Sequence, residues 1–151
     1  MRMPIADLKP ARLALCAALL APLAGCMSDS ASYLIDGDNK HTITLLRNQD
    51  FFWKKTVRLS VVPTRLPECQ ESIKIEDVPR SAEMTLYWAP DDFAEPIHIL
   101  DVEGTFYALS TRTCKSQRFE AKPANPGTPV GVFKEQDGRL AFVAAKATPA
   151  P

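Results

Sequence analysis

Apolar and polar residues alternate along several short stretches of the chain, and a period of two is typical of half-buried β-strands. Between residues 56 and 62, the side chains of Val57, Leu59 and Val61 alternate with polar neighbours, so all three are predicted to face the same side of a strand. Residues 84–88 repeat this pattern. Shorter or less regular strands are predicted at residues 41–47 and around Ile73 and Ile75.

Two pairs of predicted strands are joined by a short turn in which glycine follows an acidic residue. The pairs are 97–102 with 105–112, around Glu103-Gly104, and 130–135 with 139–144, around Asp137-Gly138. Such dipeptides favour tight hairpin turns, because glycine accepts a positive φ without a steric cost. No stretch has the apolar period of an amphipathic helix. About seven short strands therefore predict a mostly β fold, a single antiparallel β-sandwich or a small β-barrel.

The longest apolar run lies near the N-terminus, at residues 13–23. It is too short to span a bilayer comfortably, and Pro22 interrupts it. Basic residues precede the run and small residues follow it, namely Arg2, Lys9 and Arg12 before it and Ala24 and Gly25 after it. This order is typical of an export signal, so residues 1–25 are predicted to be a signal peptide that is removed.

The signal ends in Leu23-Ala24-Gly25-Cys26, and these four residues resemble the lipobox of bacterial lipoproteins. The resemblance implies that a diacylglycerol is attached to the Cys26 thiol, that signal peptidase II cuts between Gly25 and Cys26, and that the new amino group is acylated. One acyl chain holds a protein to a membrane only marginally, whereas several chains on one residue hold it firmly. Cys26 is therefore predicted to be a lipid anchor, with no other cofactor.

The residue after the anchor bears on the membrane to which the protein is sorted. In bacterial lipoproteins an aspartate there commonly marks retention in the inner membrane, and here the residue is Met27. The resemblance thus implies an outer-membrane location, facing the periplasm. The whole chain has 18 basic and 18 acidic residues, and removal of residues 1–25 leaves 15 and 17. A net charge of about −2 gives no electrostatic reason to expect nucleic-acid binding.

After Cys26, the exported part of the chain contains only Cys69 and Cys114 as further cysteines. Two spare thiols in an oxidising compartment favour a structural disulfide. A redox pair would normally be a close C-x-x-C, and these two cysteines are far apart. A zinc site would need His41 and His98 as well, and neither stands at a metal-like spacing. We therefore expect a Cys69–Cys114 disulfide and no metal site.

The remaining segments define the expected organisation of the chain. Residues 26–40 are mostly small and polar, which predicts a lipidated cysteine followed by a flexible tether. Residues 41–146 form the predicted β-domain, and residues 147–151, Ala-Thr-Pro-Ala-Pro, form a predicted disordered tail.

Evidence for catalytic chemistry is sparse. There is no G-x-S-x-G motif and no phosphate-binding glycine loop. His98 is expected to be an ordinary strand residue that faces away from Ile97 and Ile99, and His41 to be exposed at the start of a strand. Five acidic residues could supply a carboxylate pair, but a solvated loop and turn is the preferred interpretation. They are Asp91, Asp92, Glu95, Asp101 and Glu103.

Three consecutive aromatic residues, Phe51, Phe52 and Trp53, are followed by Lys54 and Lys55. Neighbouring residues of a strand point to opposite faces, so the three rings cannot all be buried on one side. One interpretation is an aromatic surface with a basic rim that contacts a protein or glycan partner. The other, which is preferred, is a bulge or strand entry whose rings cover the open end of a sheet.

The stretches HTITLLRNQDFFWKKTVRLSVVPTRLPECQ and TRTCKSQRFE resemble small lipoproteins of Gram-negative bacteria that have no assigned activity. The resemblance implies a single disulfide-bonded domain and supplies no catalytic residues. The favoured hypothesis is a non-enzymatic envelope lipoprotein that presents its β-domain to a protein or cell-wall partner. The alternatives are an inhibitor of a cell-wall hydrolase and a hydrolase that uses acidic residues between Asp91 and Glu103.

Overall fold

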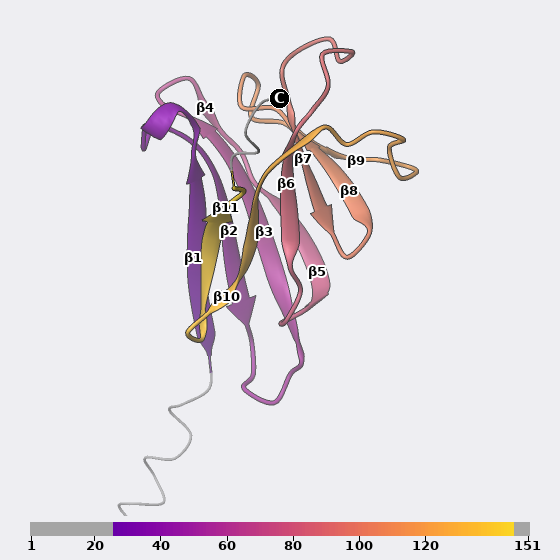
Figure 1. Ribbon diagram of the computed structural model, residues 1–151. Helices are drawn as coiled ribbons and strands as arrows, with labels where there is room; N and C mark the ends of the chain where they lie inside the picture. The colour runs from indigo at the N-terminus through magenta and orange to yellow at the C-terminus, as the bar shows by residue number, and fades with distance from the viewer. Residues whose placement is uncertain (1–25, 147–151) are drawn as a thin grey trace, which may run out of the picture.

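The computed structural model describes residues 26–146, and the predicted signal peptide and tail lie outside them. The described chain forms two antiparallel sheets that pack face to face (Figure 1). Sheet A has the strand order β1-β2-β3-β4, and β5 also pairs with β3. Sheet B has the order β11-β10-β6-β7-β8-β9.

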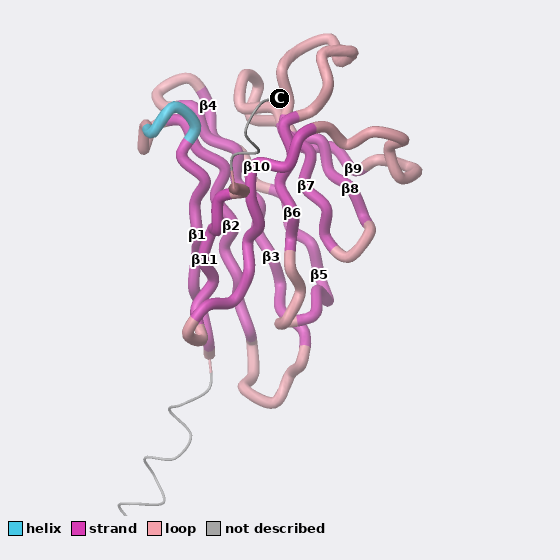
Figure 2. The backbone as a smooth tube through the Cα atoms, viewed as in Figure 1, coloured by secondary structure: helices cyan, strands magenta, loops and turns pink. Residues whose placement is uncertain are grey.

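The strands of sheet A are β1 (Met27–Leu34), β2 (His41–Gln49), β3 (Thr56–Arg65), β4 (Cys69–Gln70) and β5 (Ile73–Pro79). Those of sheet B are β6 (Met84–Trp88), β7 (His98–Val102), β8 (Thr105–Leu109), β9 (Ser116–Arg118), β10 (Thr128–Gln136) and β11 (Arg139–Ala144). One short 3-10 helix, η2 (Ile35–Gly37), joins β1 to β2 (Figure 2). None of the helical structure within residues 26–146 is long and apolar enough to cross a membrane.

The prediction of a mostly β, antiparallel sandwich is confirmed, and the alternative of a closed barrel is wrong, because the strands form two separate sheets. The described chain contains eleven strands, more than the seven expected, because short pairings such as β4 and β9 have no clear alternation. Both predicted hairpins form. At the β7–β8 turn Glu103 and Gly104 have φ values of 51° and 81°, and the β10–β11 turn has the same positive-φ pair.

Strand β1 contradicts the expected tether. Met27–Leu34 is paired along its whole length with β2, from Met27 opposite Gln49 to Leu34 opposite Thr42. The inward side of β1 carries Ala31 and Tyr33, which pack against the core. The folded domain therefore begins at Met27 rather than at residue 41. The prediction of a flexible tether is wrong for Met27–Leu34.

The main core fills the space between the sheets. Alternate side chains of β2 and β3 point into it, among them Ile43, Leu45, Leu59 and Val61, and all four are fully buried. Sheet B meets them with a similar set, Met84, Leu86, Leu100, Leu109 and Phe133. These positions confirm the alternation predicted for residues 56–62 and 84–88.

The outer faces of the two sheets differ. A second apolar cluster covers sheet B on its outer side, where Ile99 and Phe106 are buried beneath loop residues Phe93 and Phe119. The outer face of sheet A carries mainly short polar side chains and has no such cover among the residues of its neighbouring strands. Within residues 26–146, sheet B therefore carries an apolar cluster on each face.

The predicted disulfide is confirmed. Cys69 at the start of β4 bonds to Cys114 after β8, with an S–S distance of 2.00 Å. The bond joins sheet A to the loop that follows β8 in sheet B. It lies at the end of the sandwich opposite the β2–β3 loop, which is the lowest part of the coloured chain in Figure 1.

Candidate functional site

Cys26 lies at the lower end of the sandwich, directly before β1. It is exposed, and it is the free cysteine of the described chain. Its Sγ is 3.4 Å from the backbone oxygen of Asp50. Asp50 directly follows Gln49, the last residue of β2, which pairs with Met27 of β1. The thiol on which a lipid is predicted is therefore accessible and lies beside the β2–β3 loop.

That loop carries Phe51, Phe52 and Trp53, which we call the aromatic loop. The three residues are 51%, 68% and 66% exposed. Their rings pack on one another rather than on the core: Phe51 stacks on Trp53 with centroids 4.9 Å apart, and Phe52 meets Trp53 edge to face at 4.8 Å. The rings are not among the side chains packed against the two apolar clusters, which favours a contact surface over the preferred interpretation that they cover the end of a sheet.

Two of the basic residues around the aromatic loop are paired with acids. Lys54 Nζ lies 3.9 Å from Asp50 and 3.8 Å from Asp77, and Arg58 Nη2 lies 2.8 Å from Asp50. Lys55 is exposed. Of the predicted basic rim, Lys54 is thus paired and Lys55 is left as an exposed charge beside the aromatic rings.

Close to the Cys26 end of the sandwich, Arg47 of β2 forms an ion cluster between the two sheets. Its side chain is 2% exposed, yet its guanidinium donates two hydrogen bonds to the Asp29 carboxylate, at 2.9 and 2.7 Å. It also donates to Glu135 at 2.8 Å and to the backbone oxygen of Arg80. Asp29 additionally accepts a hydrogen bond from the backbone N–H of Leu140. The cluster therefore joins β1 and β2 to β10 and β11.

The charges in this cluster stabilise one another. Burial raises the pKa of Asp29, but hydrogen bonds from Arg47 and Leu140 outweigh that effect, so the pKa of Asp29 is lowered overall. The hydrogen bond from Arg47 lowers the pKa of Glu135 as well. The charged side chain of Asp29 points toward the space between the sheets, so this part of β1 lacks the apolar inward face by which a strand is predicted from sequence.

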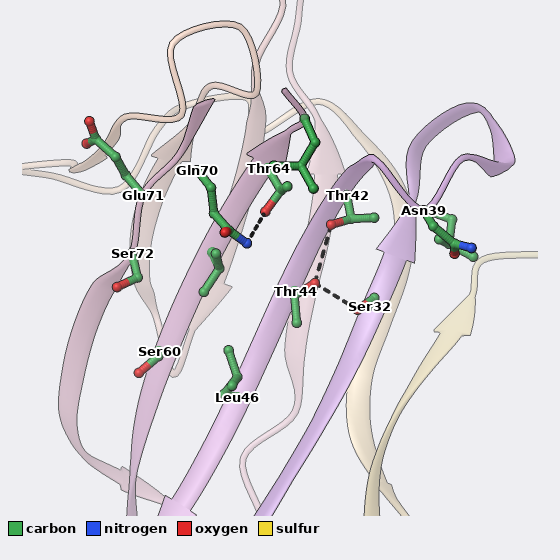
Figure 3. A pocket seen from close by; sticks show the side chains of 13 residues that line it. Ser32, Asn39, Thr42, Thr44, Leu46, Ser60, Thr64, Gln70, Glu71 and Ser72 are labelled. Atoms are coloured by element: carbon green, nitrogen blue, oxygen red, sulfur yellow. Dashed lines mark hydrogen bonds between the residues drawn. The ribbon is translucent and has the colours of Figure 1, made fainter. Parts of the chain in front are cut away.

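A groove of about 830 Å³ lies on the open outer face of sheet A (Figure 3). Its floor carries hydroxyl groups from three adjacent strands, with the apolar side chains of Leu46 and Val62 between them, and we call it the hydroxyl groove. The hydroxyl groups belong to Ser32, Thr42, Thr44, Ser60 and Thr64. Ser32 Oγ and Thr44 Oγ1 are 2.7 Å apart, across the β1–β2 pairing. Exposed Leu34 and Leu66 border the groove at its upper end.

The hydroxyl groove was missed from the sequence. A signal was present, because serine recurs at every second residue at Ser28, Ser30 and Ser32, as it would on one face of a strand. The intervening residues include Asp29 and Ala31, which do not form the apolar face that normally identifies a strand. The alternation therefore resembled a low-complexity linker.

The two histidines lie near the disulfide end. His98 is 2% exposed, and its buried Nε2 has no hydrogen-bond partner. Its ring meets those of Trp88 and Tyr33 edge to face, and burial lowers its pKa to about 4, with a smaller contribution from His41. Both faces of β7 are buried, so His98 is a core residue as well as facing away from Ile97 and Ile99.

His41 is not exposed as expected but half-buried. Its Nε2 lies 2.8 Å from Thr111 Oγ1, and its Nδ1 lies 3.6 Å from an Asp36 carboxylate oxygen. The order acid, imidazole and hydroxyl resembles a nucleophilic triad. Thr111 is buried, however, and the outer face of sheet A carries none of these three groups.

The five acidic residues considered for hydrolysis are divided between two ends of the sandwich. Asp91, Asp92 and Glu95 lie in the β6–β7 loop, whereas Glu103 lies in the turn at the other end of β7. Asp101 accepts a hydrogen bond from the backbone N–H of Gly104 and so stabilises that turn. The fold therefore does not bring the full set together around one bond. Within residues 26–146, no group of three or more His, Cys, Asp or Glu side chains is arranged to hold a metal ion.

No protein-family model matches this chain, and no curated protein or solved structure is similar enough to match it either.

Proposed function

We propose that this chain is a non-enzymatic envelope lipoprotein, anchored through lipid on Cys26 to the outer membrane and facing the periplasm. The observation that carries the proposal is the state of Cys26: the last residue of the lipobox is an exposed, free thiol at the very start of the folded domain. Cleavage before Cys26 would remove nothing from either sheet, because β1 begins at Met27. The lipid would therefore attach directly to a folded domain.

The hydroxyl groove is the face best suited to a ligand in the periplasm. Each hydroxyl can donate one hydrogen bond and accept others, so a row of them complements a neutral chain rich in hydroxyl and amide groups. Glu71 is the one ionisable residue in the groove lining, which argues against a highly charged ligand. We therefore propose a cell-wall glycan as the partner, in preference to a protein.

The anchor and the ligand are tested separately. Bacteria that express the wild-type chain should incorporate labelled palmitate into it, and a Cys26→Ala variant should not. Equal labelling of both proteins would refute the anchor.

For the ligand, purified wild-type protein should sediment with isolated peptidoglycan, whereas a Thr44→Val/Ser60→Ala variant should stay in the supernatant. Valine keeps the shape of threonine and removes its hydroxyl, so the loss would report hydrogen bonding. Thr128→Val, at an exposed residue of sheet B, is the matched control and should sediment like the wild type. Unchanged sedimentation of the groove variant would exclude this face.

A further inference from the structure

We propose that the aromatic loop inserts into the membrane interface beside the lipidated Cys26, and that it thereby holds the sandwich in a fixed orientation on the bilayer. This inference rests on the proposed lipid anchor. It differs from it by assigning a membrane contact to the folded domain itself, through Phe51, Phe52 and Trp53.

The first argument is position. Cys26 Sγ lies 3.4 Å from the backbone oxygen of Asp50, and Phe51 is the next residue. Acylation removes the thiol hydrogen, so this hydrogen bond would be lost in the lipidated protein. The short distance still shows that the sulfur atom lies beside the aromatic loop. Acyl chains that leave this atom and enter a bilayer bring the aromatic loop to the bilayer surface with them.

The second argument is the lack of slack between anchor and domain. Met27, the residue after Cys26, is already paired with Gln49 in sheet A. A long flexible linker would let the domain drift away from the membrane, whereas a strand that begins one residue after the anchor does not. The lower end of the sandwich in Figure 1, which carries the aromatic loop, is therefore held against the membrane.

The third argument is the chemistry of the surface. Among the described residues, six large apolar side chains are exposed, and three of them are the consecutive rings of the aromatic loop. Contiguous exposed apolar groups mark an interaction site, and tryptophan in particular favours the boundary between lipid headgroups and acyl chains. The stacked rings form one preassembled apolar tip rather than three separate side chains.

Charge makes only a small contribution. Lys54 and Arg58 are paired with Asp50, so few free positive charges surround the rings. Insertion should therefore take place in a neutral phosphatidylcholine bilayer and should not need anionic lipid.

The chain contains two tryptophans, and they lie at opposite ends of the sandwich. Trp53 is in the aromatic loop, and Trp88 is at the end of β6, paired with His98 near the disulfide end. Trp88 is itself 43% exposed, so it can sample solvent but should be far from the bilayer. Each tryptophan can therefore serve as the control for the other.

The experiment uses full-length protein purified from bacterial membranes, with acylation checked by mass. Trp88→Phe and Trp53→Phe variants are placed in phosphatidylcholine vesicles with plain or brominated acyl chains. Trp53 in the Trp88→Phe protein should lose roughly half of its emission to the brominated lipid, because interfacial apolar groups reach about 5–10 Å into the headgroup boundary. Trp88 in the Trp53→Phe protein should lose almost none.

The outcomes separate this inference from the proposed function. If the protein carries acyl chains but Trp53 is quenched no more than Trp88, the insertion is wrong and the anchor stands. If the protein is not acylated, both fall. If Trp53 emission is quenched by water-soluble acrylamide but not by brominated lipid, the inference is wrong. The aromatic loop would then be a contact surface for a protein or glycan partner. Should Trp88→Phe fail to fold, the difference in emission between the wild type and Trp53→Phe reports Trp53.

Discussion

The end of the sandwich beside Cys26 leaves three aromatic rings in solvent, whereas the opposite end buries an imidazole that has no hydrogen-bond partner for one of its nitrogens. The two ends also differ in what joins the sheets. Near Cys26, the cluster of Arg47, Asp29 and Glu135 links four strands through partly buried hydrogen bonds. At the far end a covalent bond between Cys69 and Cys114 does so.

This difference indicates that the residues that stabilise the fold and the residues that are available to contact a partner lie in different parts of the sandwich. The far end uses its apolar residues and its disulfide for packing. At the end beside Cys26, which we call the anchor end after the proposed lipid, the ion cluster around Arg47 joins the sheets, and the apolar residues of the aromatic loop contribute little to the core. Exposed aromatic rings lower solubility, and those of the aromatic loop are not part of the core. Such a surface typically marks a site that contacts a partner molecule or a membrane.

The largest effect is expected from Arg47→Ala. Removing the guanidinium leaves the largely buried Asp29 without its partner, which costs about 3–5 kcal/mol in the free energy of unfolding. Glu135 keeps its ion pair with Arg80 at 3.3 Å. Urea denaturation of the purified domain measures this loss, and Arg47→Lys should lose less because the charge remains. A loss below about 1 kcal/mol for Arg47→Ala would show that the ion cluster does not hold the anchor end together.

A loss of similar but smaller size is expected from Cys69→Ala/Cys114→Ala. The sequence separation of 45 residues corresponds to roughly 4 kcal/mol in the chain-entropy model, and measured losses commonly run from about 2 to 5 kcal/mol. Urea titrations with and without reductant measure it: reductant should lower the wild-type midpoint toward that of the variant and leave the variant unchanged. A wild-type midpoint insensitive to complete reduction would contradict the role of the bond.

Acid should weaken the far end through His98. Its folded pKa of about 4 lies below the ordinary value of 6.5, so between these pH values the unfolded chain binds a proton that the folded chain does not. The free energy of unfolding should therefore fall as pH drops from 6.5 to 4, by about 3 kcal/mol. His98→Phe should remove this part of the pH dependence, as measured by thermal melts across that range. An unchanged slope in the variant would contradict the assignment.

Acid should also lower the free energy of unfolding through Asp29 and Glu135 at the anchor end, but over a lower pH range than through His98. The folded pKa values of Asp29 and Glu135 are lowered, so their contribution is present above their unfolded pKa values and is lost as pH falls through the folded ones. This loss therefore begins near pH 4, where that of His98 is already complete. It should persist in His98→Phe and shrink when Arg47 is replaced, because Arg80 still lowers the pKa of Glu135.

The smallest effect on stability is expected from Phe52→Ser/Trp53→Ser. Both side chains are mostly exposed, so the free energy of unfolding should change by no more than about 0.5 kcal/mol. Denaturation of wild type and variant in parallel measures it. A loss of several kcal/mol would mean that the rings are part of the fold, and the contrast between the two ends would disappear.

Much of this fold was predictable because its strands follow simple rules. Val57, Leu59 and Val61 alternate with polar residues, and Gly104 and Gly138 mark the turns. The disulfide was predictable from the number of cysteines together with the predicted export signal. Strand β1 could not be recognised, because its inward side carries Asp29, whose partner Arg47 is 18 residues away in sequence.

The candidate sites were predictable to different degrees. Cys26 and the aromatic loop were both apparent from local sequence, but their proximity was not, since it depends on the pairing of β1 with β2. The hydroxyl groove needs three strands side by side in register, with Ser32 opposite Thr44 and Thr44 opposite Val62. Such a surface is a property of tertiary structure, and no single stretch of the chain contains it.

The central claim is that one end of the sandwich is fixed by lipid and the other by a disulfide, and the intact mass of the protein purified from bacterial membranes tests both most directly. We predict a chain that begins at Cys26, carries acyl chains, and gains the mass of two hydrogens when one disulfide is reduced. A chain that retains residues 1–25, or an unlipidated chain that begins elsewhere, would contradict the account.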